Sequence, residues 1–210
     1  LLDDRHDACR LVHSESDGLP GLVVDRYGDT AVVQLLSAGA DRWRDFWPGA
    51  LAKAAGVRAV YERSDAEVRT LEGLAPRVGP LAGDPGNVVP MREAGLRFEV
   101  DIVHGQKTGF FLDQRDNRAL AASLAAARDV LNAFCYTGGF SIAALAAGAK
   151  SVLSIDTSAE ALDSARRNGT ANGLDASRAE WAEADVFERL RKLRDQGRRF
   201  GLVVLDPTRR

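Results

Sequence analysis

Apolar and polar positions alternate differently in the two halves of this chain. In the first half, short strand-like runs lie at 22–26, 31–36 and 59–62. A stretch at 40–55 has the spacing of a helix and lies between the last two runs. This mixture of strands and helix predicts a small α+β domain over residues 1–85.

Turn-forming residues mark the end of that domain. The segment 79–90 holds three glycines and three prolines with little periodicity, which predicts a loop or linker. Strand-like runs at 88–92 and 96–103 flank the turn-like residues 93–95, and this arrangement predicts a hairpin. We therefore expect residues 86–112 to form a hairpin and a connecting block.

From residue 113 onward, helices and strands alternate over longer distances. The expected helices are 114–127, 140–147, 159–171 and 186–194, and the expected strands are 129–134, 151–155, 179–182 and 201–205. Successive parallel strands need right-handed helical crossovers, so residues 113–210 are predicted to form an α/β, Rossmann-like domain with an open sheet. Ligands of such sheets bind at the carboxyl ends of the strands.

The segment after the first of these strands is the most informative part of the chain. The strand runs into Cys135, Tyr136, Thr137, Gly138 and Gly139 before a helix begins. Adjacent glycines let a ligand approach the backbone, and the start of a helix presents unpaired N–H groups and a positive dipole end. A carboxylate or phosphate is the expected ligand, and a tight turn without a ligand is the alternative. The nicotinamide pattern Gly-x-Gly-x-x-Gly is not met.

Aspartates follow the next two strands. Asp156 ends the second strand and can accept both hydroxyls of a ribose, although it can equally cap the helix after it. Asp185 follows the third strand and can bond an adenine amino group while Val186 and Phe187 cover the ring. The alternative for Asp185 is a helix N-cap.

Asp206 and Pro207 close the fourth strand, where a carboxylate can face a target base and proline stiffens the loop beneath it. A glycine turn therefore follows the first strand, and an aspartate follows each of the next three. Together they predict a ligand site at one edge of the sheet. This set fits an adenosyl ligand better than a dinucleotide, because a dehydrogenase has no need of an Asp-Pro at the fourth strand.

A polar and aromatic block at 105–118 precedes the first helix of the second domain. Lys107 and Arg115 can meet a carboxylate, and the two adjacent phenylalanines can pack on a ring. The alternative is a solvated helix start in which Asp113 is the cap. Such a density of functional groups is unusual for a linker.

Composition narrows the classes of function. The net charge of −2 carries no overall signature of nucleic-acid binding, and the basic run at 189–199 shares its helix with buried leucines, which favours a solvated outer face. Cys9 and Cys135 are too few for a disulfide framework, and the histidines share no ligand spacing, so no metal site is expected. No membrane helix and no secretory signal are expected, and the cytoplasm is the expected location.

Four stretches of the sequence resemble one family. These are 15–29 with Asp-Gly-Leu-Pro-Gly-Leu-Val-Val-Asp-Arg-Tyr-Gly, 61–65, 105–118 with Lys-Thr-Gly-Phe-Phe-Leu-Asp-Gln-Arg, and 131–139 with Asn-Ala-Phe-Cys-Tyr-Thr-Gly-Gly. Their order and spacing are similar to those of the bacterial cytosine-C5 methyltransferases of large-subunit ribosomal RNA, which have a PUA domain, a central domain and a Rossmann-like domain. The resemblance implies a class I methyltransferase domain that binds S-adenosylmethionine, with ribosomal RNA as the partner, and it is compatible with a homodimer.

The resemblance also implies roles for individual residues. Those implied to line the cofactor pocket are Phe134, Tyr136, Thr137, Gly138 and Gly139 at the methionine end, Asp156 at the ribose, Asp185 and Val186 at the adenine, and Lys107, Thr108, Phe110, Asp113 and Arg115 around them. Asp206 and Pro207 would border the same pocket as the start of an Asp-Pro-Pro-x-Phe motif, in which Thr208 replaces the second proline. Asp206 is also the expected catalytic contact to the target base.

By the same resemblance, a cysteine thiolate would add to C6 of the cytosine and generate an enamine, because C5 is otherwise a poor nucleophile. That cysteine belongs to a Ser-Cys motif expected beyond Arg210. We therefore expect a fragment that lacks this cysteine and the PUA domain and does not methylate RNA by itself. The alternatives are a guanine-nitrogen methyltransferase, which needs no cysteine, an NAD-dependent dehydrogenase, which the glycine spacing disfavours, and a non-catalytic RNA-binding relative.

Overall fold

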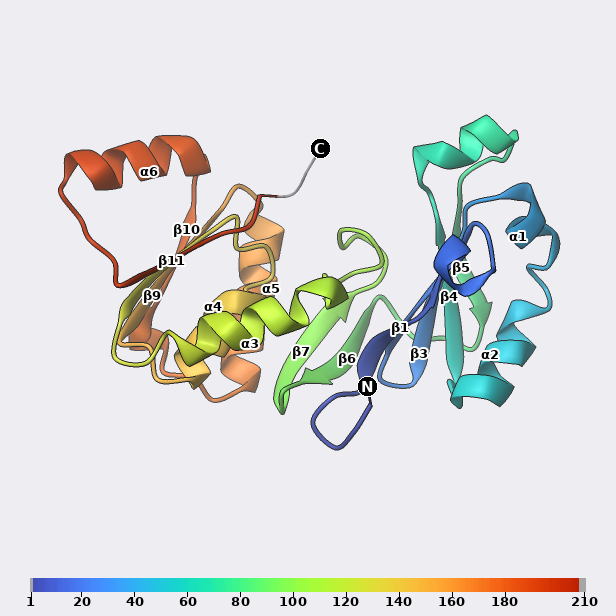
Figure 1. Ribbon diagram of the computed structural model, residues 1–210, viewed down its shortest axis with the longest axis horizontal. Coiled ribbons are helices and arrows are strands. Elements are labelled where there is room, and N and C mark those ends of the chain that lie inside the picture. Colours follow the sequence, from blue (N-terminus) through green and yellow to red (C-terminus); the bar gives the residue numbers. More distant parts are fainter. Residues whose placement is uncertain (1, 208–210) are drawn as a thin grey trace. The chain divides into compact units, whose positions relative to one another are not determined.

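The computed structural model describes residues 2–207 of the chain. The chain divides into two units, Leu1–Leu112 and Asp113–Arg210, each with a sheet and helices of its own (Figure 1). The boundary lies where the pattern of the sequence changes to alternating helices and strands. The expected hairpin belongs to the first unit in this division.

The first unit contains a five-stranded sheet whose strands follow their order along the chain. Its elements are β1 (Ala8–His13), η1 (Ser14–Asp17), β2 (Leu22–Tyr27), β3 (Thr30–Leu35), α1 (Ala38–Arg42), α2 (Trp47–Ala55), β4 (Ala59–Ser64), η2 (Glu67–Glu72) and β5 (Arg77–Ala82). Neighbouring strands are antiparallel except β3 and β4, which are parallel. A parallel pair needs a crossover connection, and α1 and α2 provide it.

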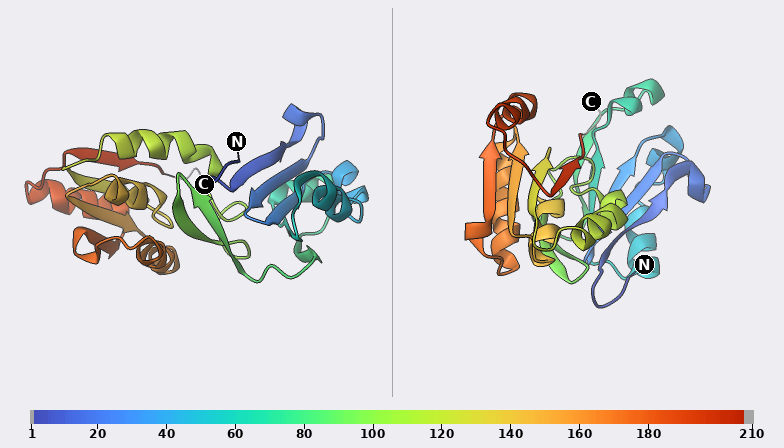
Figure 2. Two further views of the ribbon diagram at one scale, coloured as in Figure 1. Left: turned by 90° about the horizontal axis from the view of Figure 1, so that it is seen from below. Right: turned by 60° about the vertical axis from the view of Figure 1, so that its left-hand side comes forward.

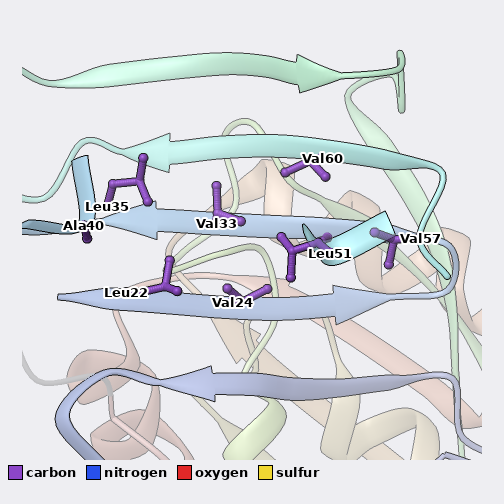
Figure 3. Close-up of a cluster of buried hydrophobic side chains, with 9 residues drawn as sticks. Leu22, Val24, Val33, Leu35, Ala40, Leu51, Val57 and Val60 are labelled. Atoms are coloured by element: carbon purple, nitrogen blue, oxygen red, sulfur yellow. The ribbon is translucent and has the colours of Figure 1, made fainter. Parts of the chain in front are cut away.

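Apolar side chains from alternate positions of the strands form the core of this unit. Leu22 and Val24 of β2 and Val33 and Leu35 of β3 are buried and pack with Leu51 of α2 in one cluster (Figure 3). Side chains two residues apart in a strand share a face of the sheet. The alternation in the sequence therefore places these side chains together under α2.

Two expectations for this unit are wrong in part. The helix expected at 40–55 is interrupted by turns at 43–46, and Pro48 lies in the first turn of α2. Proline has no N–H and its ring collides with the preceding turn, so a helix tolerates it only at the start. The loop expected at 79–90 begins later, because β5 crosses Pro80 and pairs with β4 at the edge of the sheet. The sequence pattern also does not predict β1.

A buried arginine ties three parts of the first unit together. Arg69 in η2 is almost fully buried, and its guanidinium donates to the carbonyl oxygens of Leu35 and Ala75 and to Oδ1 of Asp41, the last at 3.1 Å. Burial alone would raise the pKa of Asp41, but hydrogen bonds from Arg44 and Arg69 outweigh it and lower that pKa. The network holds η2 to the end of β3 and to α1.

The hairpin expected after the sheet is confirmed. It consists of β6 (Val88–Glu93) and β7 (Leu96–Asp101), which pair antiparallel over their whole length. Ala94 and Gly95 connect the strands with φ angles of 54° and 81°. Positive φ at both turn residues matches the right-handed twist of the strands, which is why two-residue hairpins favour it.

The second unit is built on a four-stranded parallel sheet with the order β10-β9-β8-β11. Its elements are η3 (Leu112–Gln114), α3 (Arg115–Ser123), β8 (Asp129–Ala133), α4 (Gly139–Ala146), β9 (Ser151–Asp156), α5 (Ala159–Ala171), η4 (Ala176–Arg178), β10 (Ala179–Glu183), α6 (Val186–Asp195) and β11 (Leu202–Leu205). The right-hand view of Figure 2 shows the strands side by side and running in the same direction. The predicted Rossmann-like α/β fold is confirmed, although α3 ends earlier than expected.

Helices cover both faces of this sheet. Val130 and Val152 pack against α4 on one face, and Leu131 and Leu153 pack against α6 on the other. Figure 1 shows α4 and α6 on opposite sides of the strands. Strands buried on both faces favour apolar runs, and in β8 and β9 the polar Asn132 and Ser154 interrupt these runs at buried positions. Within residues 2–207, no helix is long and apolar enough to cross a membrane.

We expect Arg69→Met to lower the free energy of unfolding of the first unit by about 3–5 kcal/mol, because it leaves buried acceptors without their donor. Urea unfolding followed by circular dichroism measures this. Arg58→Met is the matched control, since Arg58 pairs with Asp29 at the surface and an exposed ion pair contributes less than about 1 kcal/mol. Equal effects of the two substitutions would contradict the structural role of Arg69.

Candidate functional site

The order of the strands marks the ligand-binding edge of the second unit. The chain adds β9 and then β10 on one side of β8, and it returns to add β11 on the other side. The strand order therefore reverses between β8 and β11, next to the carboxyl end of β8. Open α/β sheets bind ligands at such a point, so the loop between β8 and α4 is the candidate site.

The loop after β8 has a strained backbone. Phe134, Tyr136 and Gly138 have φ angles of 62°, 48° and 81°, all in the left-handed region. Residues with a side chain enter this region at a cost in free energy, and they cluster at binding sites. A hydrogen bond of 3.0 Å from Cys135 N to Ile155 O holds the loop to β9, and one of 2.9 Å from Gly138 N to Cys135 O closes it.

Gly138 is required by packing within the second unit. A Cβ atom at this position would lie 2.9 Å from the Cβ of Ala165 in α5 and 3.1 Å from the ring of Trp181 in β10. The positive φ is a second reason for glycine here. A Cβ at Gly138 would therefore meet α5 and β10, and the role of Gly138 and Gly139 beside a ligand stays a prediction.

The start of α4 fits an anionic group. Gly139 opens the helix, and Gly138 stands at the cap position with no side-chain hydrogen bond to the first turn. The first N–H groups of a helix need acceptors from outside the helix. Thr137 is buried, and its Oγ1 has no hydrogen-bond partner among the described residues. Because an unpaired buried hydroxyl is costly, these groups together suit the carboxylate end of a ligand.

Asp156, the last residue of β9, holds the loop by a hydrogen bond to its backbone. Its Oδ2 accepts a hydrogen bond from Tyr136 N at 2.7 Å, and its Oδ1 accepts one from Ser158 N at 3.0 Å. The helix cap of α5 is Ser158, whose side chain accepts from Ala161 N, so Asp156 does not have the capping role left open as its alternative. Each carboxylate oxygen has a second lone pair, with which it can accept from a ribose hydroxyl.

Asp185 has the alternative role that the sequence left open. It is the N-cap of α6, and its Oδ1 accepts from Glu188 N at 2.8 Å. Val186 is buried in the core against the sheet, which leaves its side chain little surface for an adenine ring. Phe187 is exposed and packs edge-to-face on Phe134, with ring centroids 5.7 Å apart. The aromatic surface beside the loop therefore comes from Phe187 and Phe134.

Neither cysteine has the surroundings of a nucleophile. Burial, together with the charge of Asp156, raises the pKa of the Cys135 thiol far above its ordinary value. The thiolate is the reactive form of cysteine, so Cys135 stays protonated and unreactive at neutral pH. Cys9 is buried in β1 of the first unit.

Asp206 and Pro207 follow β11 at the same edge of the sheet as the loop. Leu205 is paired with Ala133 in the register of β11 and β8, so Asp206 and Phe134 leave the sheet at the same level. The Asp206 side chain is partly exposed and Pro207 is exposed. The structure thus brings Asp206 to the carboxyl end of β8, where the glycine turn begins.

Thr108 and Phe110 are anchored inside the first unit. The Thr108 hydroxyl is fully buried, donates to Oδ2 of Asp25 at 2.6 Å and bonds the hydroxyl of Tyr27 at 2.8 Å. Phe110 is buried against Phe98, with ring centroids 5.3 Å apart. These contacts fix the block to β2 and β7, and the assignment of both residues to the cofactor pocket stays a prediction.

The other residues of the block lie on both sides of the boundary between the units. Lys107 belongs to the first unit, and its Nζ lies 4.6 Å from the ring centre of Phe111. Asp113 lies in η3 and Arg115 is the first residue of α3, whose cap position is taken by Gln114 with no side-chain hydrogen bond. The proposed cap role of Asp113 is therefore not observed, and the cofactor role of these residues stays a prediction.

Sequence reasoning missed a set of buried polar residues beside the loop. Asn132 in β8, Ser141 in α4 and Ser154 in β9 are linked by hydrogen bonds. The sequence does contain an indication of this set, because Asn132 and Ser154 are polar residues at buried positions of otherwise apolar strands. The described part of the chain holds no group of three or more histidine, cysteine or acidic side chains that could bind a metal ion.

Comparison with known proteins identifies a family and relatives to which this chain is similar. Residues 75–209 match the family described as S-adenosylmethionine-dependent methyltransferase. The ribosomal RNA large subunit methyltransferase I of Shewanella denitrificans is 51% identical over 199 residues, which are 94% of this chain and 50% of that protein. The protein of the same name from Klebsiella pneumoniae is 49% identical over 205 residues, which are 97% of this chain and 51% of that protein. The chain therefore spans about half the length of these relatives.

Solved structures are similar over the same length. A putative SAM-dependent methyltransferase from Streptococcus mutans is 26% identical with a TM-score of 0.83, over 98% of this chain and 53% of that chain. A crystal structure of a putative methyltransferase complexed with SAH is also 26% identical with a TM-score of 0.85, over 98% of this chain and 52% of that chain. The fold, the glycine turn and the family match agree, and the chain belongs to the S-adenosylmethionine-dependent methyltransferases.

Proposed function

We propose that this chain binds S-adenosylmethionine at the loop between β8 and α4, as part of an enzyme that methylates C5 of a cytosine in large-subunit ribosomal RNA. The observation that carries the proposal is the loop itself. It combines a helix start without a side-chain cap, the Thr137 hydroxyl, which has no hydrogen-bond partner within residues 2–207, and the Asp156 carboxylate. Membership of the methyltransferase family supports the cofactor and removes the dehydrogenase alternative.

The residues of the loop suit the different parts of this cofactor. The start of α4 and Thr137 Oγ1 would hold the methionine carboxylate. The free lone pairs of Asp156 would accept the ribose hydroxyls. Phe187 would pack on the adenine, and the second oxygen of Asp185 would accept from its amino group. Phe134, which the resemblance assigns to the methionine end, contacts Phe187 and would border the adenine as well. When bound, S-adenosylmethionine supplies a methyl group on a sulfonium, ready for transfer to a nucleophile.

The proposed substrate comes from the curated relatives and from the resemblance noted in the sequence. The relatives are named for large-subunit ribosomal RNA, and the chain spans about half of them, so the substrate belongs to the proposal. Asp206 beside the start of the loop would face the base. Transfer to cytosine C5 requires a thiolate that adds to C6, and the surroundings of Cys9 and Cys135 exclude both from this role.

We expect S-adenosylhomocysteine to stabilise the folded chain and NAD to have no effect. At a ligand concentration a hundred times the dissociation constant, the gain is about 2.7 kcal/mol, since the ligand binds only the folded state. Differential scanning fluorimetry with both ligands measures the shift in Tm. A shift with NAD and none with S-adenosylhomocysteine would contradict the assignment.

We expect Asp156→Ala to weaken S-adenosylhomocysteine binding by at least tenfold, because it removes both the ribose acceptor and the brace on Tyr136 N. Charge-assisted hydrogen bonds contribute about 1.5–3 kcal/mol each. Asp163→Ala is the matched control, since Asp163 lies on the exposed face of α5 and pairs only with Arg166 among the contacts described. Calorimetric affinities that are the same for both variants would mean that Asp156 does not serve the cofactor.

We expect Cys135→Ser to leave cofactor binding within about threefold of the unmodified chain. The thiol is buried and protonated, so it supplies no nucleophile. Calorimetry with S-adenosylhomocysteine measures binding, and binding weakened more than threefold in Cys135→Ser would contradict this expectation. Labelled S-adenosylmethionine with unmodified large-subunit ribosomal RNA measures transfer, of which we expect none by this chain alone. Transfer that is lost in Cys135→Ser with normal binding would overturn this view of the thiol, and methylguanosine as the product would favour a guanine-nitrogen methyltransferase.

A further inference from the structure

The core of the second unit contains three polar side chains directly beneath the candidate site. Asn132 of β8, Ser141 of α4 and Ser154 of β9 are each almost fully buried, and we call them the polar stripe. Asn132 Nδ2 donates to Ser141 Oγ at 2.8 Å, and Ser141 Oγ lies 2.7 Å from Ser154 Oγ, where either hydroxyl can donate. These bonds join the first turn of α4 to the ends of two strands.

The register of the sheet explains where the polar stripe lies. Asn132 and Ser154 are paired neighbours in β8 and β9. Val130 and Val152, two residues earlier in each strand, pack with α4 in an apolar cluster. Since side chains two apart in a strand share a face, the polar stripe continues this layer toward the carboxyl ends of the strands. The contact with α4 therefore changes from apolar to polar as it approaches the loop.

Stability alone does not account for this change. Buried polar groups lose their hydration, and hydrogen bonds among themselves do little more than offset that loss, whereas apolar side chains would pack α4 against the sheet without it. Hydrogen bonds have directional geometry, which apolar contacts lack. A polar stripe at this place fixes the orientation of α4 to the strand ends more narrowly than an apolar layer would.

The loop needs such a fixed orientation. Its ends are the last residue of β8 and the first turn of α4, and between them Phe134, Tyr136 and Gly138 have left-handed backbone angles. Strained backbone persists only where the surrounding structure holds it in place. The polar stripe holds both ends of this segment at once, because Asn132 lies two residues before Phe134 and Ser141 lies three residues after Gly138.

We infer that Asn132, Ser141 and Ser154 are positioning residues for the cofactor loop. They keep the first turn of α4 and the ends of β8 and β9 in the one arrangement in which the loop receives its ligand. They act through the backbone of the loop and need no contact with the ligand. The inference rests on the proposed binding of S-adenosylmethionine at this loop.

The test compares the same substitution at two serines of one strand. Ser154→Ala breaks the polar stripe, whereas Ser151→Ala removes a hydroxyl that donates to Asp129 Oδ1 at 2.7 Å at the opposite end of the same two strands. We expect Ser154→Ala to weaken S-adenosylhomocysteine binding about tenfold, with Ser151→Ala within twofold of the unmodified chain. Urea midpoints of both variants are measured in parallel. Ser154→Thr restores a hydroxyl and is expected to recover most of the affinity.

A second substitution keeps the inference testable if Ser154→Ala does not fold. Asn132→Leu replaces the buried amide with an apolar side chain of similar size, and we expect it to weaken binding about tenfold while the urea midpoint is unchanged or higher. Binding by these variants equal to that of Ser151→Ala would overturn the inference and leave the proposed function intact. Failure of the folded, unmodified chain to bind S-adenosylhomocysteine would overturn the proposed function, and this inference with it.

Discussion

The carboxylate of Asp156 holds the turn on which the candidate site depends. It accepts a hydrogen bond from the amide of Tyr136, a residue whose backbone lies in the left-handed region. Its charge also adds to burial in raising the pKa of the neighbouring Cys135 thiol. One side chain therefore shapes the loop and keeps the adjacent cysteine protonated, while its remaining lone pairs can accept from a ligand.

The two faces of the parallel sheet differ in polarity near the carboxyl ends of the strands. Against α6, the strands are apolar to their carboxyl ends, with Ala133 and Ile155 buried in the cluster there. Against α4, Val130 and Val152 give way to the polar stripe. Both faces therefore contain a buried apolar cluster, and the face that contacts α4 becomes polar toward the carboxyl ends of the strands, next to the loop.

The contacts of the arginine side chains explain why the net charge of −2 gives no indication of nucleic-acid binding. Lysine contributes only four of the 28 basic residues, yet many arginines bond groups of the chain itself. Arg10 pairs with the buried Asp25, Arg44 with Glu62, and Arg69 donates to backbone carbonyls. The basic run near the end of the chain behaves similarly, since Arg189 and Arg198 both reach Glu180. The buried pairs stabilise the first unit, whereas the more exposed pairs of Arg189 and Arg198 contribute less. Arg191 and Arg194 of the basic run are exposed, as expected for a solvated outer face.

The sequence by itself determined the alternating helices and strands of the second unit, the hairpin, and the glycine turn with aspartates at strand ends, because period and turn chemistry are local properties. It did not determine what each residue does there. Gly138 faces α5 and Trp181, Asp185 caps α6, Val186 lies in the core, and Thr108 binds Asp25. Only the tertiary structure decided these roles and revealed the polar stripe, because they depend on contacts between strands and helices that are distant in the chain, and local spacing does not contain such contacts.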